Sequence, residues 1–508
     1  MTYFSKPLKS KLYSLSKGLA AAPFLLAPLA SQAQEKPNVL FIIADDLNTR
    51  IGPYMELDRH TPNLNRLAEE GVQFTRTYCQ YPVSGPSRAS LMSGLYPETN
   101  GVLSNRKDIG SYRAITPQLS NHPSLAGYFR EQGYFTARVS KIYHMGVPGG
   151  IEAGEVGSDD PDSWDYAYNV MGPETRTKGS LEHLSPGVTH SGGAFARMII
   201  GNEQEVTQTD YLAASQAISI LENRAGRAPD WKTNVTQKKE HAPLFLAVGF
   251  VRPHVPLIAP ENCYEDYPDD KMKIPETAAG DNVPKRALAN NNRRKWKMSR
   301  EQQQKTLAGY MASVQFMDRQ VGRLLDALDR LKLRENTIVI FVSDHGYNLG
   351  EHNCWSKVSL WEGSVRVPMI ISHPKMKKKG TQFTGITELV DLYPTLADLC
   401  GLAGGRPERL HGQSLAESIM KGKNSSEKEY AYTVTYGGSA GTIRSQKWRY
   451  TRWSENAEAG REELYCHQSD PEEHVNLADD PKYSEQLQKL RAVYEKIRDQ
   501  ARKDKQNL

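Results

Sequence analysis

The sequence predicts an α/β protein in which helices flank a large, mostly parallel sheet, and a smaller antiparallel sheet with one helix follows near the C-terminus. Two observations predict the large sheet: short apolar runs rich in β-branched residues recur along the chain, and segments with helical periodicity alternate with them. A third observation predicts the smaller unit, because from about residue 430 the pattern changes to short β-like stretches with glycine-rich turns.

The alternating elements begin with residues 38–43, a continuous apolar run typical of a buried parallel strand. Residues 61–70 predict a helix that ends with Gly71 as its C-cap. Residues 303–331 predict the longest helix, since apolar side chains recur there on one stripe. The other predicted elements are helices at residues 124–131, 210–222 and 483–503, and strands at residues 134–139, 244–250, 337–342 and 367–371.

The composition is that of an ordinary globular protein. The chain has 508 residues, of which 38% are hydrophobic and 24% charged, enough for one large domain and a smaller one. A net charge of +5 is compatible with an anionic substrate but does not indicate nucleic acid, so we expect no nucleic-acid partner. We expect the large domain to span residues 34–425 and an α+β subdomain to span residues 426–508.

The N-terminus has the features of a secretory signal. Four lysines between residues 6 and 17 precede an apolar stretch over residues 19–30, and Ser31-Gln32-Ala33 fits a small-x-small cleavage site. We therefore expect residues 1–33 to be a signal peptide and the protein to be exported, either to the periplasm or out of the cell. The apolar stretch is too short for a membrane span, and no later segment is long enough for one.

The cysteines give a weaker constraint. Disulfides are possible after export, but an odd number of cysteines leaves at least one thiol without an intramolecular partner. No CxxC pair exists, which argues against a cysteine metal site. The five cysteines are Cys79, Cys263, Cys354, Cys400 and Cys466.

Acidic residues follow two of the predicted strands. Asp45 and Asp46 come directly after residues 38–43, and Asp344 and His345 come just after residues 337–342. Because ligands bind beyond the carboxyl ends of parallel strands, we expect these side chains to form an oxygen-rich site for a hard divalent cation such as Ca²⁺. Taken alone, the Asp45–Asp46 pair would also fit a turn or a helix cap.

The run Ser84-Gly85-Pro86-Ser87-Arg88 predicts a helix start beside an anion. Proline suits the first helical turn, so Ser84 lies at the N-terminus, where free N–H groups favour negative charge. Arg88, one turn later, is placed to reach back to that charge. The alternative is an ordinary Ser-Gly-Pro turn that leads into a helix.

The longer run over residues 84–94 resembles the signature of type I sulfatases, in which a Cys or Ser is oxidised after synthesis to formylglycine. Residues 343–352 resemble the iduronate-2-sulfatase branch of that family, and the matching motifs follow one another in consistent order over nearly the whole mature chain. Ser93 and Ser140 are mild departures from the pattern. The other matching segments are Gly133-Tyr134, Ser140-Lys141-Ile142-Tyr143-His144, Arg252-Pro253-His254-Val255-Pro256, Trp355-Ser356-Lys357, Arg366-Val367-Pro368, Glu463-Leu464-Tyr465, Asp470-Pro471-Glu472 and Asn476-Leu477.

The resemblance implies an alkaline-phosphatase-like sandwich and an exported sulfatase that hydrolyses sulfate esters of an oligo- or polysaccharide. It implies one Ca²⁺ per chain and a formylglycine made from Ser84 by a maturase that accepts serine. The implied metal ligands are Asp45, Asp46, Ser84, Asp344 and His345.

The resemblance also implies catalytic roles for six residues. Arg88 and Lys141 would stabilise the formylglycine diol and the sulfate charge, and His144 would accept a proton when the sulfated intermediate collapses. His254 and Lys357 would contact the sulfate, with His254 the acid for the departing sugar oxygen. Together with Ser84 these are the expected catalytic residues.

Two other functions remain open on the sequence. One is a phosphate-ester or phosphodiester hydrolase of the same superfamily with Ser84 unmodified, although such enzymes generally use two zinc ions and only one metal cluster is assignable here. The other is an inactive carbohydrate-binding relative, against which the complete motif set argues. A native serine-type enzyme and an inactive Cys→Ser variant would also share this sequence.

Several further residues allow two interpretations. The basic segment 285–297 fits a solvated loop or an anion-guiding rim. Glu351 and His352 would support the metal site from behind. The aromatic residues Tyr347, Trp355 and Trp361 would line a sugar subsite or pack in the core.

Overall fold

The computed structural model describes residues 36–508 apart from residues 56–59, 106–110, 191, 228–241, 276–281, 403, 425–426 and 459. The expected signal peptide lies outside the described residues. Residues Lys36–Leu508 cluster into one compact unit. Among the described helices, none combines the length and the apolar character that a membrane crossing needs.

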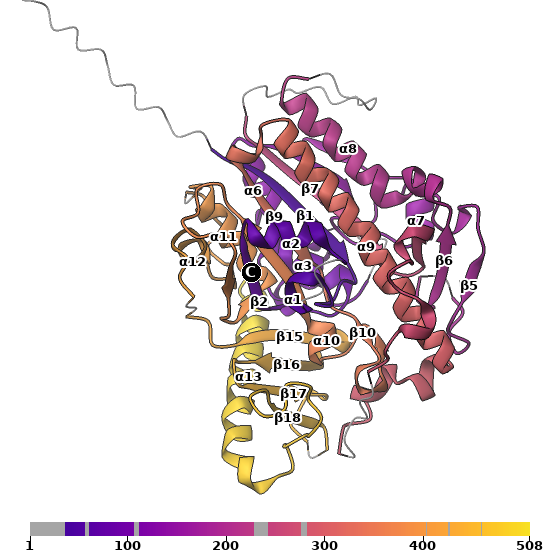
Figure 1. Cartoon of the computed structure of the whole chain (residues 1–508). Helices are drawn as coiled ribbons and strands as arrows, with labels where there is room; N and C mark the ends of the chain where they lie inside the picture. Colours follow the sequence, from indigo (N-terminus) through magenta and orange to yellow (C-terminus); the bar gives the residue numbers. More distant parts are fainter. Residues whose placement is uncertain are drawn as a thin grey trace, which may run out of the picture. The chain divides into compact units, whose positions relative to one another are not determined.

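A large mixed sheet forms the centre of this unit (Figure 1). All its pairings are parallel except those of β12, which runs antiparallel to both of its neighbours. The predicted mostly parallel sheet is therefore confirmed. In spatial order the strands are β13 (Thr381–Phe383), β2 (Val72–Tyr78), β12 (Arg366–Ser372), β9 (Thr337–Ser343), β1 (Asn38–Asp45), β7 (Leu244–Pro253), β3 (Phe135–Ser140) and β4 (Tyr166–Tyr168), and β14 (Thr387–Glu388) also pairs with β2.

Helices cover both faces of the sheet, so every residue of its central strand β1 is buried. Alternate side chains of β1 join two different cores: Leu40 and Ile42 face one, and Phe41 and Ile43 face the other. The first face packs against α2 (Pro62–Glu69), α8 (Thr209–Arg224) and α9 (Arg300–Arg330), and the second against α3 (Ser84–Ser93), α6 (Leu125–Glu131) and α11 (Leu392–Leu399).

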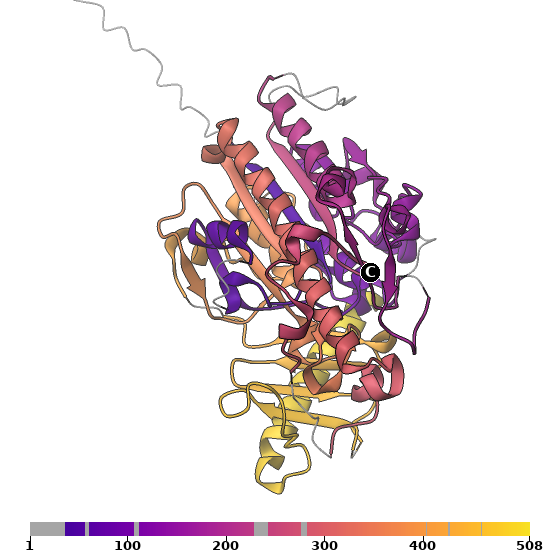
Figure 2. The same cartoon turned by 45° about the vertical axis from the view of Figure 1, so that its right-hand side comes forward.

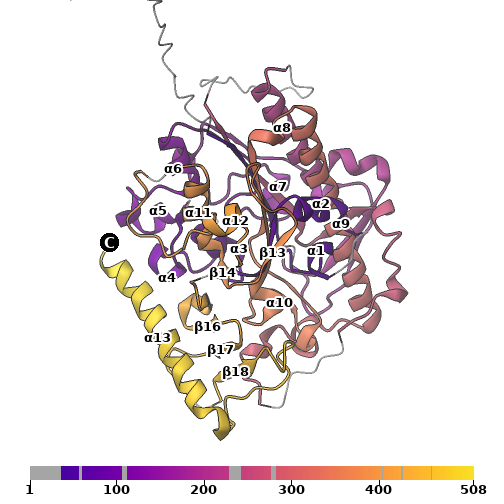
Figure 3. The same cartoon turned by 60° about the vertical axis from the view of Figure 1, so that its left-hand side comes forward.

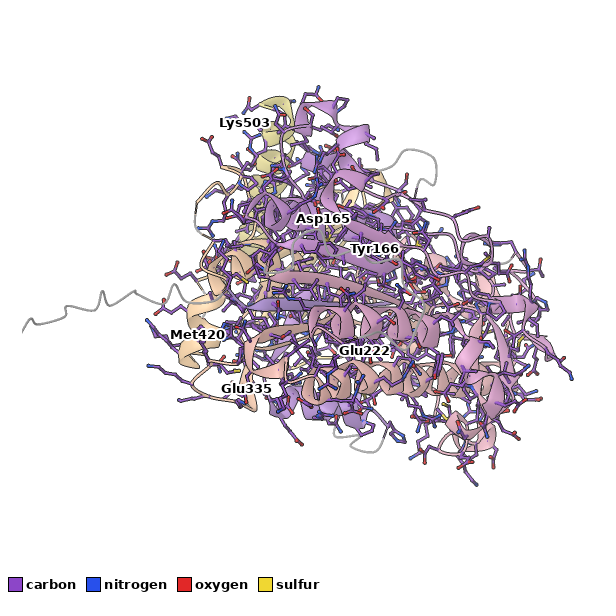
Figure 4. All side chains as sticks on the ribbon, turned by 90° about the horizontal axis from the view of Figure 1, so that it is seen from above. Asp165, Tyr166, Glu222, Glu335, Met420 and Lys503 are labelled. Carbon is purple, nitrogen blue, oxygen red and sulfur yellow. The ribbon has the colours of Figure 1, made fainter. Side chains whose placement is uncertain are left out.

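Helices α8 and α9 lie side by side on their face of the sheet (Figures 1 and 2). Arg330, at the end of α9, donates to Glu222 of α8 over 2.7 Å, and Figure 4 labels Glu222 in a view from above. Each helix thus presents its apolar side to the sheet while a charged pair links the two at one end.

Shorter elements complete the large domain. A three-stranded sheet contains β5 (Leu181–His183), β6 (Ala196–Ile200) and β8 (Leu257–Pro260), and a two-stranded one contains β10 (Asn348–Leu349) and β11 (Trp355–Ser356). The short helices are α1 (Gly52–Met55), α4 (Pro97–Asn100), α5 (Tyr112–Ile115), α7 (Gly149–Glu152), α10 (Glu362–Val365) and α12 (Ala416–Lys421).

The C-terminal part is a four-stranded antiparallel sheet with one long helix, as predicted (Figure 3). Tyr450 of the sheet and Tyr494 of the helix are both buried in a separate small core between them. The elements are β15 (Ala431–Thr435), β16 (Ala440–Arg444), β17 (Trp448–Arg452), β18 (Glu462–Cys466) and α13 (Ser484–Gln506).

One local prediction was wrong. Helix α2 ends at Glu69, and its C-cap is Glu70 in a right-handed conformation, so Gly71 is not a left-handed cap. Glycine is needed at position 71 for a different reason: a Cβ there would lie 2.6 Å from the carbonyl oxygen of Ile371 on β12. The close approach of a distant strand, which local sequence does not encode, explains this glycine.

The five cysteines are all buried and all free. The possible disulfides considered from the sequence are thus not formed. Burial raises the pKa of the Cys263 thiol to about 12, so it behaves as a small apolar core residue.

Candidate active site

The site lies at one edge of the large sheet, where four neighbouring parallel strands end. Strands β9, β1, β7 and β3 are consecutive in the sheet and run in the same direction, so their carboxyl ends meet. Predicted site residues lie at the end of each: Asp344 and His345 follow β9, Asp45 ends β1 and Asp46 follows it, His254 follows β7, and Lys141 and His144 follow β3.

Asp45, Asp46, Asp344 and His345 form a buried cluster whose ligand atoms all lie within 4.8 Å of one another. The Nε2 atom of His345 is 3.2 Å from Oδ1 of Asp46. Its Nδ1 atom is 2.8 Å from the carbonyl oxygen of Gly346, which only accepts, so Nδ1 holds the proton and Nε2 presents its lone pair to the cluster. This arrangement of three carboxylates and an imidazole suits a divalent cation.

Ser84 lies against this cluster, at the first position of α3. Its hydroxyl donates to Oδ1 of Asp45 over 2.8 Å and is 3.2 Å from Nε2 of His345. The side chain is fully buried, and it comes from a segment about 40 to 260 residues away in sequence from the groups it meets. The structure therefore brings residue 84 into contact with the candidate metal ligands.

The guanidinium of Arg88 is also fully buried and joins three segments. Its Nε donates to Oδ2 of Asp344 over 2.8 Å, and its Nη2 is 3.7 Å from Oδ1 of Asp45. Its Nη1 donates to the carbonyl oxygens of Lys141 and, over 3.1 Å, of Ile142. Arg88 thus holds α3, β9 and the segment after β3 in fixed positions around the cluster.

Each carboxylate of the cluster has its own cation. Lys141 pairs with Asp45, Lys357 pairs with Asp46 over 2.7 Å, and Arg88 pairs with Asp344. Burial alone would raise the pKa of Asp45, but the positive charge of Lys141 and its neighbours holds that pKa well below its usual range. Fixed negative and positive charges are therefore balanced before any ion or ester enters the site.

One carboxylate oxygen in the cluster is left over. Oδ2 of Asp46 is buried and has no hydrogen-bond partner among the described residues. Tyr310 fixes this residue through the backbone, since its hydroxyl donates to the carbonyl oxygen of Asp46 over 2.8 Å. A buried carboxylate oxygen without a partner is costly, and a bound cation would satisfy it.

The two predicted histidines are buried and neutral. Burial lowers the pKa of His144 to about 2, and its Nδ1 has no hydrogen-bond partner within the described part of the chain. Burial, and after it the charge of Lys357, lowers the pKa of His254 well below its usual value. The Nδ1 atom of His254 donates to the carbonyl oxygen of Val255 over 2.6 Å, and its Nε2 is 3.8 Å from Oδ2 of Asp46.

Sequence reasoning missed the groups that hold the His254 segment. Asp210, at the start of α8, accepts the backbone N–H groups of Val251 and Arg252 over 2.7 and 3.0 Å. Arg252 in turn pairs with the buried Glu174 over 2.7 Å. An aspartate in the first turn of a helix is ordinary in any sequence, so nothing local distinguished Asp210 from a simple helix start.

The basic segment 285–297 is only partly exposed to solvent. Asn290 is buried, donates to the carbonyl oxygen of Lys357 and accepts from Lys295 over 2.8 Å. Trp296 is buried as well, whereas Arg293 and Arg294 are exposed. The segment therefore packs against the backbone that presents Lys357.

Three aromatic residues, for which the sequence allowed either a sugar subsite or core packing, are core residues. Tyr347, Trp355 and Trp361 are 2%, 0% and 1% exposed, which leaves almost no surface for a sugar. His352 stacks on Trp361 with ring centroids 4.1 Å apart. Glu351 pairs with Arg50 over 2.5 Å, and these contacts support the segment after the metal cluster without entering it.

The comparisons with known proteins agree with this geometry. Residues 37–218 and 220–402 match the family model described as Sulfatase, and residues 350–500 match one described as N-sulphoglucosamine sulphohydrolase, C-terminal. A sulfatase of Formosa agariphila is 31% identical over 472 residues, which cover 91% of this chain and 87% of that protein. Iduronate 2-sulfatase of Homo sapiens is 30% identical over 417 residues, covering 73% and 70%.

Solved structures show the same fold. A 2-O GAG sulfatase superposes with a TM-score of 0.66 at 24% identity, covering 93% of this chain and 94% of its own. A phosphonate monoester hydrolase from Silicibacter pomeroyi superposes with a TM-score of 0.69 at 20% identity, covering 92% and 96%. The alkaline-phosphatase-like fold is confirmed, and since the Sulfatase model spans most of the residues and the bacterial relative aligns along nearly the whole chain, this protein belongs to the sulfatase family and is a sulfuric ester hydrolase.

Proposed function

We propose that this protein is an exported sulfatase that removes sulfate from a sulfated carbohydrate, with a formylglycine made from Ser84 and one divalent cation. The observation that supports this most is the position of Ser84, whose Oγ lies 2.8 Å from Asp45 and 3.2 Å from His345 inside the acidic cluster. The names of the relatives, iduronate 2-sulfatase among them, favour a sulfated sugar as substrate. The lysine-rich, apolar N-terminal segment favours export.

The residues present fit a divalent cation. Asp45, Asp46, Asp344 and His345, with the side chain at position 84, would hold it, and the unpartnered Oδ2 of Asp46 is the atom that most needs it. Carboxylate oxygens predominate in this set, so we propose Ca²⁺, one per chain. When bound, the ion would neutralise negative charge on the sulfate and favour ionisation of the attacking hydroxyl.

A hydrated formylglycine at position 84 would supply the hydroxyl that attacks sulfur and, afterwards, a carbonyl-forming route that expels sulfate. The chain's own residues prepare this position. Lys141 and Arg88 place positive charge beside Asp45, next to residue 84, and Lys357 places it beside Asp46. Because these cations are already fixed by ion pairs, they need no reorganisation when charge develops on the ester.

We assign the two histidines to proton transfer. His144 is neutral, and the negative charge of a bound sulfate would raise its lowered pKa toward the range in which a ring nitrogen accepts a proton from the residue-84 hydroxyl. His254 has its proton on Nδ1, and its Nε2 faces Asp46. To act as the acid for the sugar oxygen, Nε2 must first be protonated, and the negative charge of a bound ester favours that form.

We also propose a division of labour within the chain. Residues 34–425 hold every proposed site residue, and residues 426–508 supply the antiparallel sheet and α13. The first group would form the catalytic domain and the second a supporting subdomain after removal of residues 1–33.

The proposed modification is testable by mass. Protein produced with a maturase that accepts serine is expected to contain a peptide around residue 84 that has lost two hydrogens and reacts as an aldehyde. Protein from a host without such a maturase, which retains the serine, is the matched control and should be inactive. Full activity in a sample whose residue 84 is an unmodified serine would contradict the formylglycine mechanism.

Asp210 is proposed as a positioning residue for His254, and the chain offers a close control. Asp210→Ala is expected to lower kcat on a sulfated sugar about tenfold or more by freeing the His254 segment, while KM changes little. Asp318 has the same local role elsewhere, since it accepts the N–H groups of Asn63 and Leu64 over 3.1 and 2.8 Å.

Both substitutions should cost stability, about 1–3 kcal/mol, because Asp210→Ala leaves two backbone donors unpaired and Asp318→Ala leaves three donors, the two backbone N–H groups and the side-chain amide of Asn63. Only the Asp210→Ala variant should lose more activity than its unfolded fraction explains. Asp210→Asn, which retains a hydrogen-bond acceptor, should recover part of the lost activity. Equal kcat losses in the Asp210 and Asp318 variants would assign Asp210 a purely structural role.

A further inference from the structure

A cavity is lined by residues outside the catalytic cluster. Its volume is about 910 Å³, within the roughly 300–1,000 Å³ range of small-molecule sites. It is bordered by α1, α10, the end of β16 and the turns that follow β16 and β18 in the C-terminal sheet, and Figures 1 and 3 show α10 between α1 and that sheet. None of its described lining residues belongs to the proposed catalytic or metal-binding set.

Two cations on the wall of this cavity are not neutralised. Arg76 and Lys447 have no ion-pair partner among the described residues; Arg76 donates to the carbonyl oxygen of Thr384 over 2.5 Å, and Lys447 lies 5.3 Å from the Trp448 ring. Arg366 is only weakly paired, at 3.9 Å from Glu362. The wall therefore has two unpaired cations available to an anion, beside one carboxylate, that of Glu472, which also has no ion-pair partner among the described residues.

One side of the cavity is formed by charged side chains that already pair with one another. Glu362 and Glu473 share the buried Arg449, and Arg444 pairs with Glu362 over 3.0 Å. His467 is 2.9 Å from Glu473. Since arginines already occupy these carboxylates, a metal ion would have to displace them, and the network is better suited to holding Arg444 in a fixed orientation at the cavity surface.

An unpartnered amide lies just behind the cavity wall. Asn348 lines the cavity and is 0% exposed, yet neither its Oδ1 nor its Nδ2 has a hydrogen-bond partner among the described residues. A buried amide with both ends unpaired costs free energy unless something hydrogen-bonds to it.

We propose that this cavity is a second binding site for a sulfated carbohydrate chain, distinct from the catalytic centre. Sulfate groups would pair with Arg76 and Lys447. Asn48 and Asn348 line the cavity two and three residues after Asp46 and His345, so the segments that form the metal cluster continue into its wall. The choice of ligand rests on the proposed function, whereas the cavity and its charge do not.

Direct binding separates this inference from catalysis. The Ser84→Ala variant, which is expected not to turn over substrate, would be titrated calorimetrically with a sulfated hexasaccharide and with the same sugar after desulfation. The Arg76→Glu/Lys447→Glu double substitution in that background is expected to weaken binding of the sulfated form about tenfold or more, with a reduced salt dependence. The Lys271→Glu/Lys421→Glu pair, which makes the same charge change at exposed positions, is the control.

In the active enzyme the cavity variant should raise KM for a sulfated polymer about tenfold and leave turnover of a small aryl sulfate within about twofold. Unchanged binding and unchanged polymer KM relative to the control pair would overturn the second site. If the variant weakens hexasaccharide binding but the parent enzyme hydrolyses no sulfated sugar, the cavity assignment stands and the proposed function fails. A loss no larger than that of the control pair assigns the effect to overall charge and also overturns the proposal.

Discussion

Asp45→Ala is expected to abolish sulfate-ester turnover, with a loss of at least about 10³-fold. Asp45 accepts the Ser84 hydroxyl, contacts both Lys141 and Arg88, and belongs to the proposed cation site, so its removal disturbs nucleophile, cations and metal together. Turnover of a sulfated sugar and elemental analysis of the purified protein should be measured together. The parent is expected to hold one Ca²⁺ per chain and the variant well under one.

Stability must be followed in the same experiment. Lys141 is fully buried, and loss of its carboxylate partner leaves an uncompensated charge that costs about 3–5 kcal/mol. Asp45→Asn keeps the volume and the hydrogen-bond acceptor, and Asp326→Ala removes a carboxylate that is 70% exposed. If folded Asp45→Asn protein keeps its metal and full activity, the assignment of Asp45 is wrong, and two zinc ions per parent chain would favour the phosphatase alternative.

His254→Ala is expected to cripple hydrolysis of a sulfated sugar while damaging that of a nitrophenyl sulfate far less. A general acid contributes about 10²–10⁴-fold when the leaving group is a sugar alkoxide, whereas a nitrophenolate leaves without a proton. The expected ratio of the two losses is therefore at least about tenfold. The measurement is kcat/KM for both substrates in parent and variant.

The comparison also removes trivial explanations. Misfolding or metal loss would depress both substrates equally, and His183→Ala, at an exposed position of β5, controls for loss of an imidazole. Equal losses on both substrates, with fold and metal content intact, would mean that His254 only binds sulfate. The acid role would then pass to another group such as His144.

Local sequence was sufficient for the central strands of the large sheet and for the residues at their ends, but β2 and the three-stranded sheet were not predicted. The runs that became β1 and β9 are continuous and apolar because both faces of the sheet are covered, and such runs are recognisable without any partner. Polar residues placed directly after them, Asp45 and Asp344, had to lie at the sheet edge wherever the strands paired. The start of α3 at Ser84 followed in the same way from proline and helix geometry.

The tertiary structure decided which of these ends are neighbours and which charges pair. The sheet order β9, β1, β7, β3 sets Lys141 against Asp45 and His254 near Asp46, and the hydrogen bond from Asp46 to Asp344 spans 298 residues of sequence. No local pattern specifies contacts over such separations, because they depend on how the packed layers bring distant segments together.

The same reason explains what sequence missed or left open. Gly71 is required by the approach of Ile371, Asp210 gains its role from the backbone of β7, and the core packing of Trp355 is visible only once its neighbours are in place. Apolar runs, helical periodicity and motifs were enough for the central strands, the main helices, the residues at the strand ends and the likeness to sulfatases. Only the folded chain decided the ion pairs, the supports and the cavity, since distance and burial fix the energy of a charge or a hydrogen bond, and both are properties of the packed molecule.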